Sequence, residues 1–242
     1  FGRRAIKSRT NLFDIVLEPG GENTYYCRVE SDGDVVDIPI VIWNQKNYLD
    51  HTNNQQFFLG FYYGLLLLII IVNILYYFNL RDKTYLSYIL YIICLGLYIA
   101  ARDGLAFQYL WPDFPWFANR AVVLFSILTV VTVFIFSQAT LQTRKNLPVL
   151  NRIINYLNIF FVLCIILSFT TDNLYAFFIN FGNITTSVAI GLFFVMAIAS
   201  IRKKIKYATY FLVAISFLVA GTILVMFKNA GVLGFISGDT GI

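Results

Sequence analysis

Long apolar stretches separated by short polar turns dominate the chain and predict a helical membrane bundle. Phe57–Leu80 is about 24 residues without a charge, and Tyr85–Ala101 is a second uncharged stretch. A helix needs about 20 apolar residues to cross the hydrocarbon core of a bilayer. The turn between them, Arg81-Asp82-Lys83-Thr84, is short enough to require a tight hairpin. These two stretches therefore predict a pair of antiparallel spans.

Four further apolar stretches extend this pattern over residues 56–228. We expect spans at about 57–80, 85–101, 120–141, 153–170, 174–201 and 207–227. The fifth is long enough to tilt or to protrude. Residues 229–242 are rich in glycine and too polar to span, so we expect a periplasmic loop that leads to a seventh span beyond the chain end. The predicted fold class is a membrane all-α, polytopic helical bundle.

Residues 1–55 follow a different pattern. Apolar and polar residues alternate over Thr24–Glu30 and Val36–Trp43, and Gly, Pro and Asp turns flank these runs. Such period-two runs predict strands of an antiparallel sheet. Together with the short apolar run Leu12–Leu17, these make three short strands, which cannot enclose a core, so we expect the end of an extracytoplasmic, jelly-roll-like β-sandwich. A polar linker is expected over Asn44–Gln56.

Composition and charge agree with a membrane protein. The chain is 59% hydrophobic and only 13% charged, whereas a soluble domain is about 25% charged. The net charge of +5 does not indicate nucleic-acid binding, because the basic residues lie in short turns. Lys and Arg are concentrated after the first, third and fifth expected spans, at Arg81, Lys83, Arg144, Lys145, Arg152, Arg202, Lys203, Lys204 and Lys206. These loops are therefore predicted to be cytoplasmic, and residues 1–55 to lie outside.

The loop after the second expected span combines charge with aromatic residues. The candidates for ligand binding or domain docking are Arg102, Asp103, Trp111, Asp113, Trp116 and Arg120. One interpretation is interfacial anchoring by amphipathic aromatics. The other is a lid over the outer mouth of the bundle, which binds a ligand or docks the sandwich. Arg102 and Arg120 would then suit a carboxylate or a phosphate.

Two other sets of residues have both a structural and a functional interpretation. Gly60, Tyr62, Tyr63 and Gly64 open the first span, either as an aromatic belt with a packing notch or as a joint that couples the sandwich to the helix. The polar residues expected in the bundle interior are Asn73, Asn155, Asn158, Asn180 and Asn183. They form either interhelical hydrogen bonds or a polar pocket.

No pattern in the sequence predicts catalysis. The chain has no Gly-rich phosphate loop, no metal-binding helix motif and no nucleophile paired with a base. The three cysteines, Cys27, Cys94 and Cys164, fit neither a disulfide framework nor a metal site, and His51 is the only histidine. We therefore expect no enzyme activity, no metal and no cofactor in this chain.

The chain resembles the bacterial seven-transmembrane receptors with diverse intracellular signalling modules. The resemblance rests on Gly60-x-Tyr62-Tyr63-Gly64, the Arg81-Asp82-Lys83 turn and Tyr109-Leu110-Trp111-Pro112, and it extends over nearly the whole chain. It implies a multi-pass protein of the bacterial inner membrane with a periplasmic β-sandwich ahead of the helices. Such a receptor reports a periplasmic ligand, for which a carbohydrate is one option, or a protein partner to a cytoplasmic kinase, cyclase or phosphatase. A homodimer is also implied.

Two alternatives from other functional classes remain at this point. One is an accessory membrane-anchor subunit of an envelope complex. The other is a permease or channel, which is less favoured because the chain shows no internal repeat and no charged residue at mid-membrane.

Overall fold

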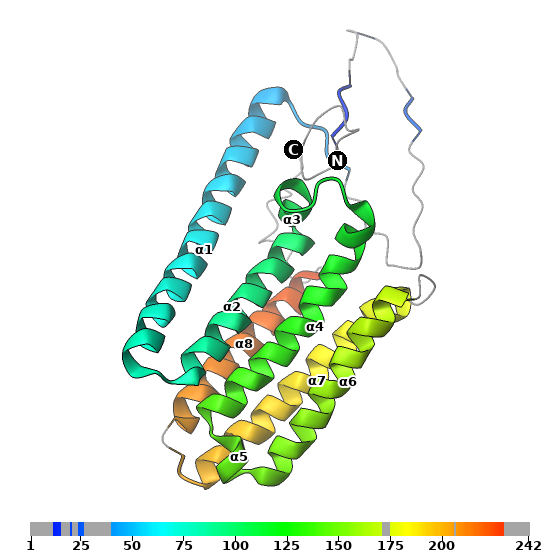
Figure 1. The fold of residues 1–242 in the computed structure, drawn as a ribbon. Coiled ribbons are helices and arrows are strands. Elements are labelled where there is room, and N and C mark those ends of the chain that lie inside the picture. The colour runs from blue at the N-terminus through cyan, green and yellow to red at the C-terminus, as the bar shows by residue number, and fades with distance from the viewer. Residues whose placement is uncertain are drawn as a thin grey trace.

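The structure is a computed structural model that describes residues 12–15, 20, 24–26, 40–170, 175–205 and 207–229. Side chains at 119, 170, 175–187, 218–219 and 222–229 lie outside this description. The helices are α1 (Gln45–Leu80), α2 (Lys83–Arg102), α3 (Leu105–Tyr109), α4 (Pro115–Thr140), α5 (Thr143–Asn146), α6 (Pro148–Thr170), α7 (Tyr175–Arg202) and α8 (Ala208–Asn229). The long helices run alternately in opposite directions (Figure 1).

Four of the described helices, α1, α2, α4 and α6, are long and apolar enough to cross a bilayer. In α7 and α8, the apolar segments found among the described residues are Val188–Arg202 and Ala208–Phe217, which are shorter than a full span. The predicted helical membrane fold is thus confirmed at this level. That α7 and α8 also cross the membrane stays a prediction.

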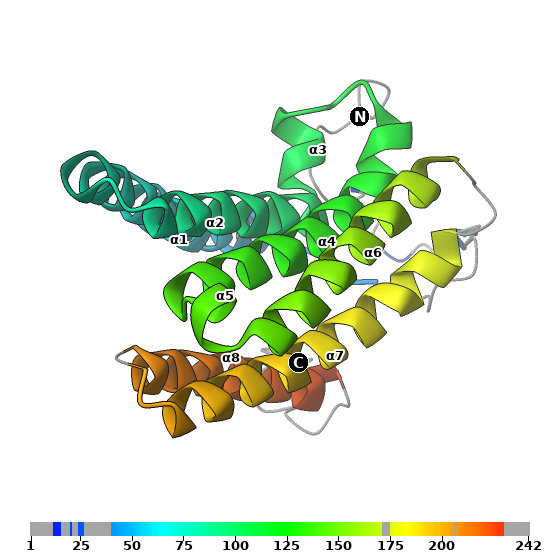
Figure 2. The same cartoon turned by 60° about the horizontal axis from the view of Figure 1, so that its bottom comes forward.

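Helix α4 is the centre of the bundle. It packs against α2 on one side and against α6 and α7 on another, while α8 packs against α7 (Figure 2). The core between α4, α6, α7 and α8 contains Val123, Ile127, Val131, Phe134, Leu141, Ile154, Phe161, Cys164, Ala189, Phe193, Met196, Ala197, Ala208, Phe211 and Ile215. The rings of Phe134 and Phe193 lie 4.7 Å apart between centroids at its middle. Apolar residues on facing helices therefore form one continuous core.

Helix α1 lies outside this core and packs chiefly against α2. None of its 36 residues is buried. The turn into α2 is the tight hairpin that the sequence predicts. Arg81 ends α1 with a left-handed φ of 55°, and the Asp82 side chain accepts a 2.8 Å hydrogen bond from the Thr84 N–H at the start of α2. The carboxylate thus satisfies one of the free N–H groups at a helix start.

The predicted linker over Asn44–Gln56 is wrong, because α1 begins at Gln45 and is helical through these residues. Asn44 caps the helix, and its side chain accepts a hydrogen bond from the Lys46 N–H at 3.3 Å. The His51 ring stacks on Trp43 at 4.8 Å between centroids. A helix already nucleated by the apolar stretch extends at low cost through residues that include no Gly or Pro.

The loop predicted between Arg102 and Asn119 is also shorter than expected, because it contains α3 and the start of α4. Gly104 has a φ of 77° and separates α2 from α3, a conformation that suits glycine. Pro115 occupies the first turn of α4, where backbone N–H groups have no partner within the helix, so the N–H that proline lacks costs no hydrogen bond. Pro115 thus starts a helix inside the segment that was predicted as a loop.

Three other expectations from the sequence are either partly wrong or not confirmed. The loop predicted over residues 142–152 contains α5, and α6 begins at Pro148 rather than at Ile153. No strand is present in residues 12–15, 24–26 or 40–44, and most of the region predicted as a β-sandwich lies outside the described residues, so the sandwich is not confirmed. The predicted loop after residue 229 also lies outside them.

Candidate functional site

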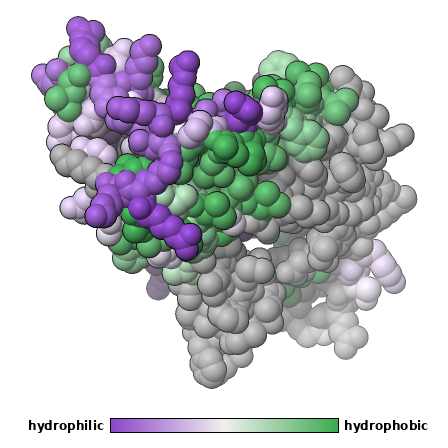
Figure 3. Space-filling view, turned by 90° about the horizontal axis from the view of Figure 1, so that it is seen from below, coloured by the Kyte–Doolittle hydropathy of each residue, from purple (hydrophilic) through white to green (hydrophobic). Residues whose placement is uncertain are grey.

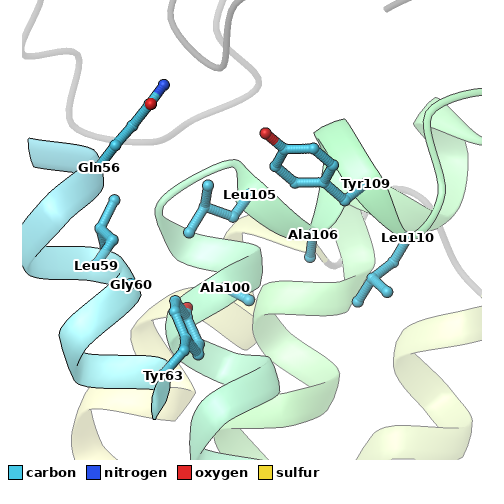
Figure 4. Close-up of a pocket in the computed structure, with 9 residues that line it drawn as sticks. All are labelled: Gln56, Leu59, Gly60, Tyr63, Ala100, Leu105, Ala106, Tyr109 and Leu110. Atoms are coloured by element: carbon cyan, nitrogen blue, oxygen red, sulfur yellow. The ribbon is translucent and has the colours of Figure 1, made fainter. Parts of the chain in front are cut away.

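A groove of about 400 Å³ opens where α1 passes α3, at the end of the bundle opposite the α1–α2 turn (Figures 1 and 4). It is lined by Gln56, Leu59, Gly60 and Tyr63 of α1, Ala100 of α2, and Leu105, Ala106, Tyr109 and Leu110 in and after α3. The groove exists because α3 turns the chain away from α1 directly after α2 ends. The predicted coupling joint on α1 and the segment after α2 thus share one site.

Small residues make the room in this groove. A Cβ atom added at Gly60 would meet no other atom within 4 Å. Ala100 and Ala106 are buried in its wall. Leu59, Leu105 and Leu110 supply the larger aliphatic side chains of its lining. The groove therefore has an apolar interior that fits an aliphatic or aromatic group.

Polar groups are few and lie near the edge. Gln56 points out of the groove beyond its upper rim, and the Tyr109 hydroxyl lies on the opposite rim (Figure 4). The Tyr63 hydroxyl is buried and has no hydrogen-bond partner among the described residues. The Asp103 carboxylate is close enough to interact electrostatically with Tyr62 and Tyr63. An amphipathic ligand or a side chain with one polar end would match this distribution.

The predicted docking residues divide into two groups. Arg102 and Asp103 are exposed at the end of α2, and the Asp103 carboxylate is the one that interacts with Tyr62 and Tyr63 of α1. Asp113 is exposed in the α3–α4 turn. Trp111, Trp116 and Arg120 instead belong to an aromatic cluster that connects the α3–α4 segment with α6. The structure therefore does not gather all six candidates at one place.

The aromatic cluster holds Arg120 inside the protein. The Arg120 guanidinium lies over the Trp116 ring at 4.3 Å from the centroid, and its Nη1 donates a 3.4 Å hydrogen bond to the Trp116 carbonyl. Trp116 in turn contacts Phe169 of α6, with ring centroids 5.8 Å apart. Trp111 packs edge-on against Phe117 at 5.0 Å. A cation over an indole is stabilised by about 0.5–2 kcal/mol, so this arrangement supports an anchoring role.

The predicted interior amides have separate roles. Asn73 donates to the Ile69 carbonyl of its own helix at 2.8 Å. Asn155 is exposed rather than interior, so the prediction is wrong for this residue, and it accepts a 2.9 Å hydrogen bond from Gln138 Nε2, which joins α6 to α4. The Asn158 Oδ1 is buried without a partner among the described residues. Asn180 and Asn183 lie outside the described side chains.

Sequence reasoning missed a polar network around Asn155 at the α4–α5–α6 corner. Asn151 Oδ1 accepts hydrogen bonds from Gln138 Nε2 at 3.0 Å and from Thr143 Oγ1 at 2.8 Å. Thr143 is fully buried. The available signal was the spacing of Asn151, Asn155 and Asn158 at i, i+4 and i+7, which places all three on one helix face.

Comparison with known proteins gives one family. A family model described as "7TM diverse intracellular signalling" matches residues 55–239. No curated protein and no solved structure matches the chain. The matched region begins in α1 and includes the groove, the aromatic cluster and the polar network.

Proposed function

Because the chain belongs to the family of seven-transmembrane proteins with diverse intracellular signalling, we propose that it is the membrane part of a receptor. A ligand or partner protein acts on the side of the membrane where α3 lies, and an output module responds on the other side. Beyond the family match, the observation that most supports this proposal is the packing of α1. This helix contacts chiefly α2 and buries no residue, and the groove lies at its junction with α3.

The length of α1 makes it suitable for carrying a displacement into the membrane. Its 36 residues correspond to about 54 Å of helix at 1.5 Å per residue, whereas the hydrocarbon core is about 30 Å thick. The polar segment Gln45–Gln56 supplies the part that projects. A force applied at the start of α1 is therefore transmitted along one continuous helix past the groove to the Arg81 turn.

A cross-linking comparison tests whether α1 is the moving element. A Cβ at Gly96 would lie 3.3 Å from Leu66 Cδ1, so Leu66→Cys with Gly96→Cys reports α1–α2 packing. Phe134→Cys with Phe193→Cys is the matched core pair between α4 and α7. With the native cysteines replaced by alanine, we expect deletion of residues 1–39 to change the yield of the first cross-link and to leave the second unchanged.

The same pairs test signalling in cells that contain the receptor with its output. Oxidising the α1–α2 pair is expected to fix the output in one state, whereas oxidising the core pair leaves it responsive. Equal yields with and without residues 1–39, together with a normal response from the oxidised α1–α2 pair, would contradict the proposal. Equal changes in both pairs would also contradict it, because they would indicate general loosening.

The proposed orientation places the start of α1 in the periplasm and α5 in the cytoplasm of a bacterial cell. The excess of Lys and Arg at the α5 end supports this orientation. Asn53 and Lys145 are both exposed and lie at opposite ends of the bundle. A membrane-impermeant maleimide is expected to label Asn53→Cys in intact spheroplasts and Lys145→Cys only after permeabilisation. The reverse pattern would overturn the orientation and with it the assignment of the input side.

A further inference from the structure

A second groove, of about 380 Å³, lies at the opposite end of the bundle from the first and is not used by the proposed receptor mechanism. It opens between the start of α6 and the last turns of α7 and is lined by Leu147, Val195, Ile198, Ala199, Arg202 and Lys203. Four of these residues are apolar and two carry positive charge at the helix end. The groove therefore combines an apolar wall with a cationic rim.

The two cations at the rim lie in a region with almost no negative charge. The sequence has no Asp or Glu between Asp113 and Asp239 except Asp172, which precedes α7 in the chain. Among the residues that the structure describes, the other charged side chains at this end of α5, α6 and α7 are Arg144, Lys145, Arg152 and Lys204, all of them exposed. Figure 3 views this end and shows hydrophilic side chains directly beside apolar ones. The nearest carboxylate in the turns at this end, that of Asp82, caps α2.

Lys203 is held at the groove rather than extended freely into solvent. Its Nζ donates a hydrogen bond to the Asn146 carbonyl, which connects the end of α7 with α5. Arg202 is exposed beside it. The exposed Ile198 and Val195 follow on the same side of α7, about one and two turns deeper into the membrane, respectively. The rim thus presents fixed positive charge at the level where a helix leaves the hydrocarbon core.

We propose that this groove binds one anionic phospholipid, with its phosphate between Arg202 and Lys203 and an acyl chain along Val195 and Ile198. Basic pockets between transmembrane helices are suited to anionic headgroups, and an aliphatic wall contributes to binding only if the ligand has an acyl chain. A free phosphate would use the cations alone. The bound lipid would connect α5 and α6 to α7, and the proposal is independent of the receptor function.

Native mass spectrometry of the full chain in a neutral detergent tests the proposal. The probes are phosphatidylglycerol and phosphatidylcholine with the same acyl chains, titrated separately. We expect one retained phosphatidylglycerol and no retained phosphatidylcholine. The double variant Arg202→Gln/Lys203→Gln is expected to weaken binding about 25-fold, since each basic residue near an anionic lipid contributes roughly a factor of five.

The matched control is Arg81→Gln/Lys83→Gln, which removes the same charge from the α1–α2 turn at the same end of the bundle. It is expected to leave the affinity for phosphatidylglycerol unchanged. An equal loss in both double variants would overturn the site, because it would indicate a general effect of net charge. Equal retention of the two lipids would also overturn it.

A second variant keeps the proposal testable if the charge variant does not fold. Ala199→Leu adds bulk inside the groove, whereas Ala214→Leu makes the same change at an exposed position on α8. We expect only the first to reduce lipid retention. Competition distinguishes the two sources of phosphate, because soluble glycerol phosphate should not displace the lipid. Full displacement, or equal retention in both leucine variants, would contradict binding of an acyl chain.

Discussion

Replacing Asn151 by alanine tests whether the polar network at the α4–α5–α6 corner stabilises the bundle. The Asn151 Oδ1 accepts one hydrogen bond from Gln138 and one from Thr143. Hydrogen bonds between membrane helices contribute about 0.6 kcal/mol each, so the two bonds account for about 1.2 kcal/mol. The fully buried Thr143 hydroxyl is also left without its acceptor, at a further cost of about 1–3 kcal/mol. The expected loss in free energy of unfolding is therefore about 2–4 kcal/mol.

Asn155→Ala is the matched comparison in the same network. Asn155 is exposed and accepts a single hydrogen bond from Gln138. Gln138 Nε2 still has both Asn151 oxygens within hydrogen-bond distance after this change. The expected loss is therefore about 0.6 kcal/mol. Reversible unfolding in mixed micelles with increasing SDS measures both variants on the same scale.

The decisive variant adds Thr143→Val to Asn151→Ala. Valine keeps the shape of the threonine side chain and removes the hydroxyl that would otherwise be buried without a partner. The double variant is expected to be more stable than Asn151→Ala alone by about 1–3 kcal/mol. Additive losses from the two substitutions would refute the reasoning, because they would show that the Thr143 hydroxyl and the Asn151 amide do not interact. Equal losses for Asn151→Ala and Asn155→Ala would refute it as well.

Two other predictions concern packing, and the same unfolding assay measures both. Phe134→Ala removes a fully buried ring from the core and is expected to lower the free energy of unfolding by about 3–5 kcal/mol. Ile135→Ala, at a 40% exposed position, is expected to lower it far less. Similar losses for the two variants would contradict the assigned core. Gly96→Val is expected to separate α1 from α2, because a Cβ added at Gly96 would lie 3.3 Å from Leu66 Cδ1, whereas one added at Gly191 would meet open space. Overpacking of this kind lowers the free energy of unfolding by about 1–3 kcal/mol. An equal loss for Gly191→Val would contradict the α1–α2 interface.

The extents of the helices could be predicted from the sequence largely because charge is nearly absent from the spans. The turn at Arg81 and Asp82 and the second, fifth and sixth expected spans agree with helix ends within about two residues, the usual uncertainty of a helix boundary. The larger errors occur at Asn44, Pro115 and Pro148. Asn44 caps the start of α1, and Pro115 and Pro148 are the first residues of α4 and α6. The sequence pattern predicted a linker or a loop at all three positions. The same residue type can start a helix or interrupt one. Which of the two it does depends on whether the residues that follow it are helical.

The arrangement of the candidate site was less accessible to sequence reasoning. Asp103 interacts with α1, whereas Trp116 contacts α6, because the short helix α3 reverses the chain between them. A membrane helix can be apolar on every face, so its pattern does not reveal which side meets another helix. Helix α1 is such a case, since apolar residues surround its membrane part. The groove at Gly60 and Ala106 depends on contacts that only the three-dimensional structure supplies.

Helix α1 is less buried than the helices of the core, so the free energy of ligand binding should displace α1 more easily than the core helices. Moving α1 relative to α2 displaces a helix that buries none of its own residues, whereas moving α4 relative to α7 disturbs the contact of the buried Phe134 with the buried Phe193. Removing one such ring costs about 3–5 kcal/mol, while a ligand typically shifts a two-state equilibrium by a few kcal/mol. A few kcal/mol is comparable with the loss of a single such ring contact, so we expect an input of that size to reposition α1 more readily than to repack the core. We expect α2, which lies between α1 and α4, to be the helix through which any further change must pass.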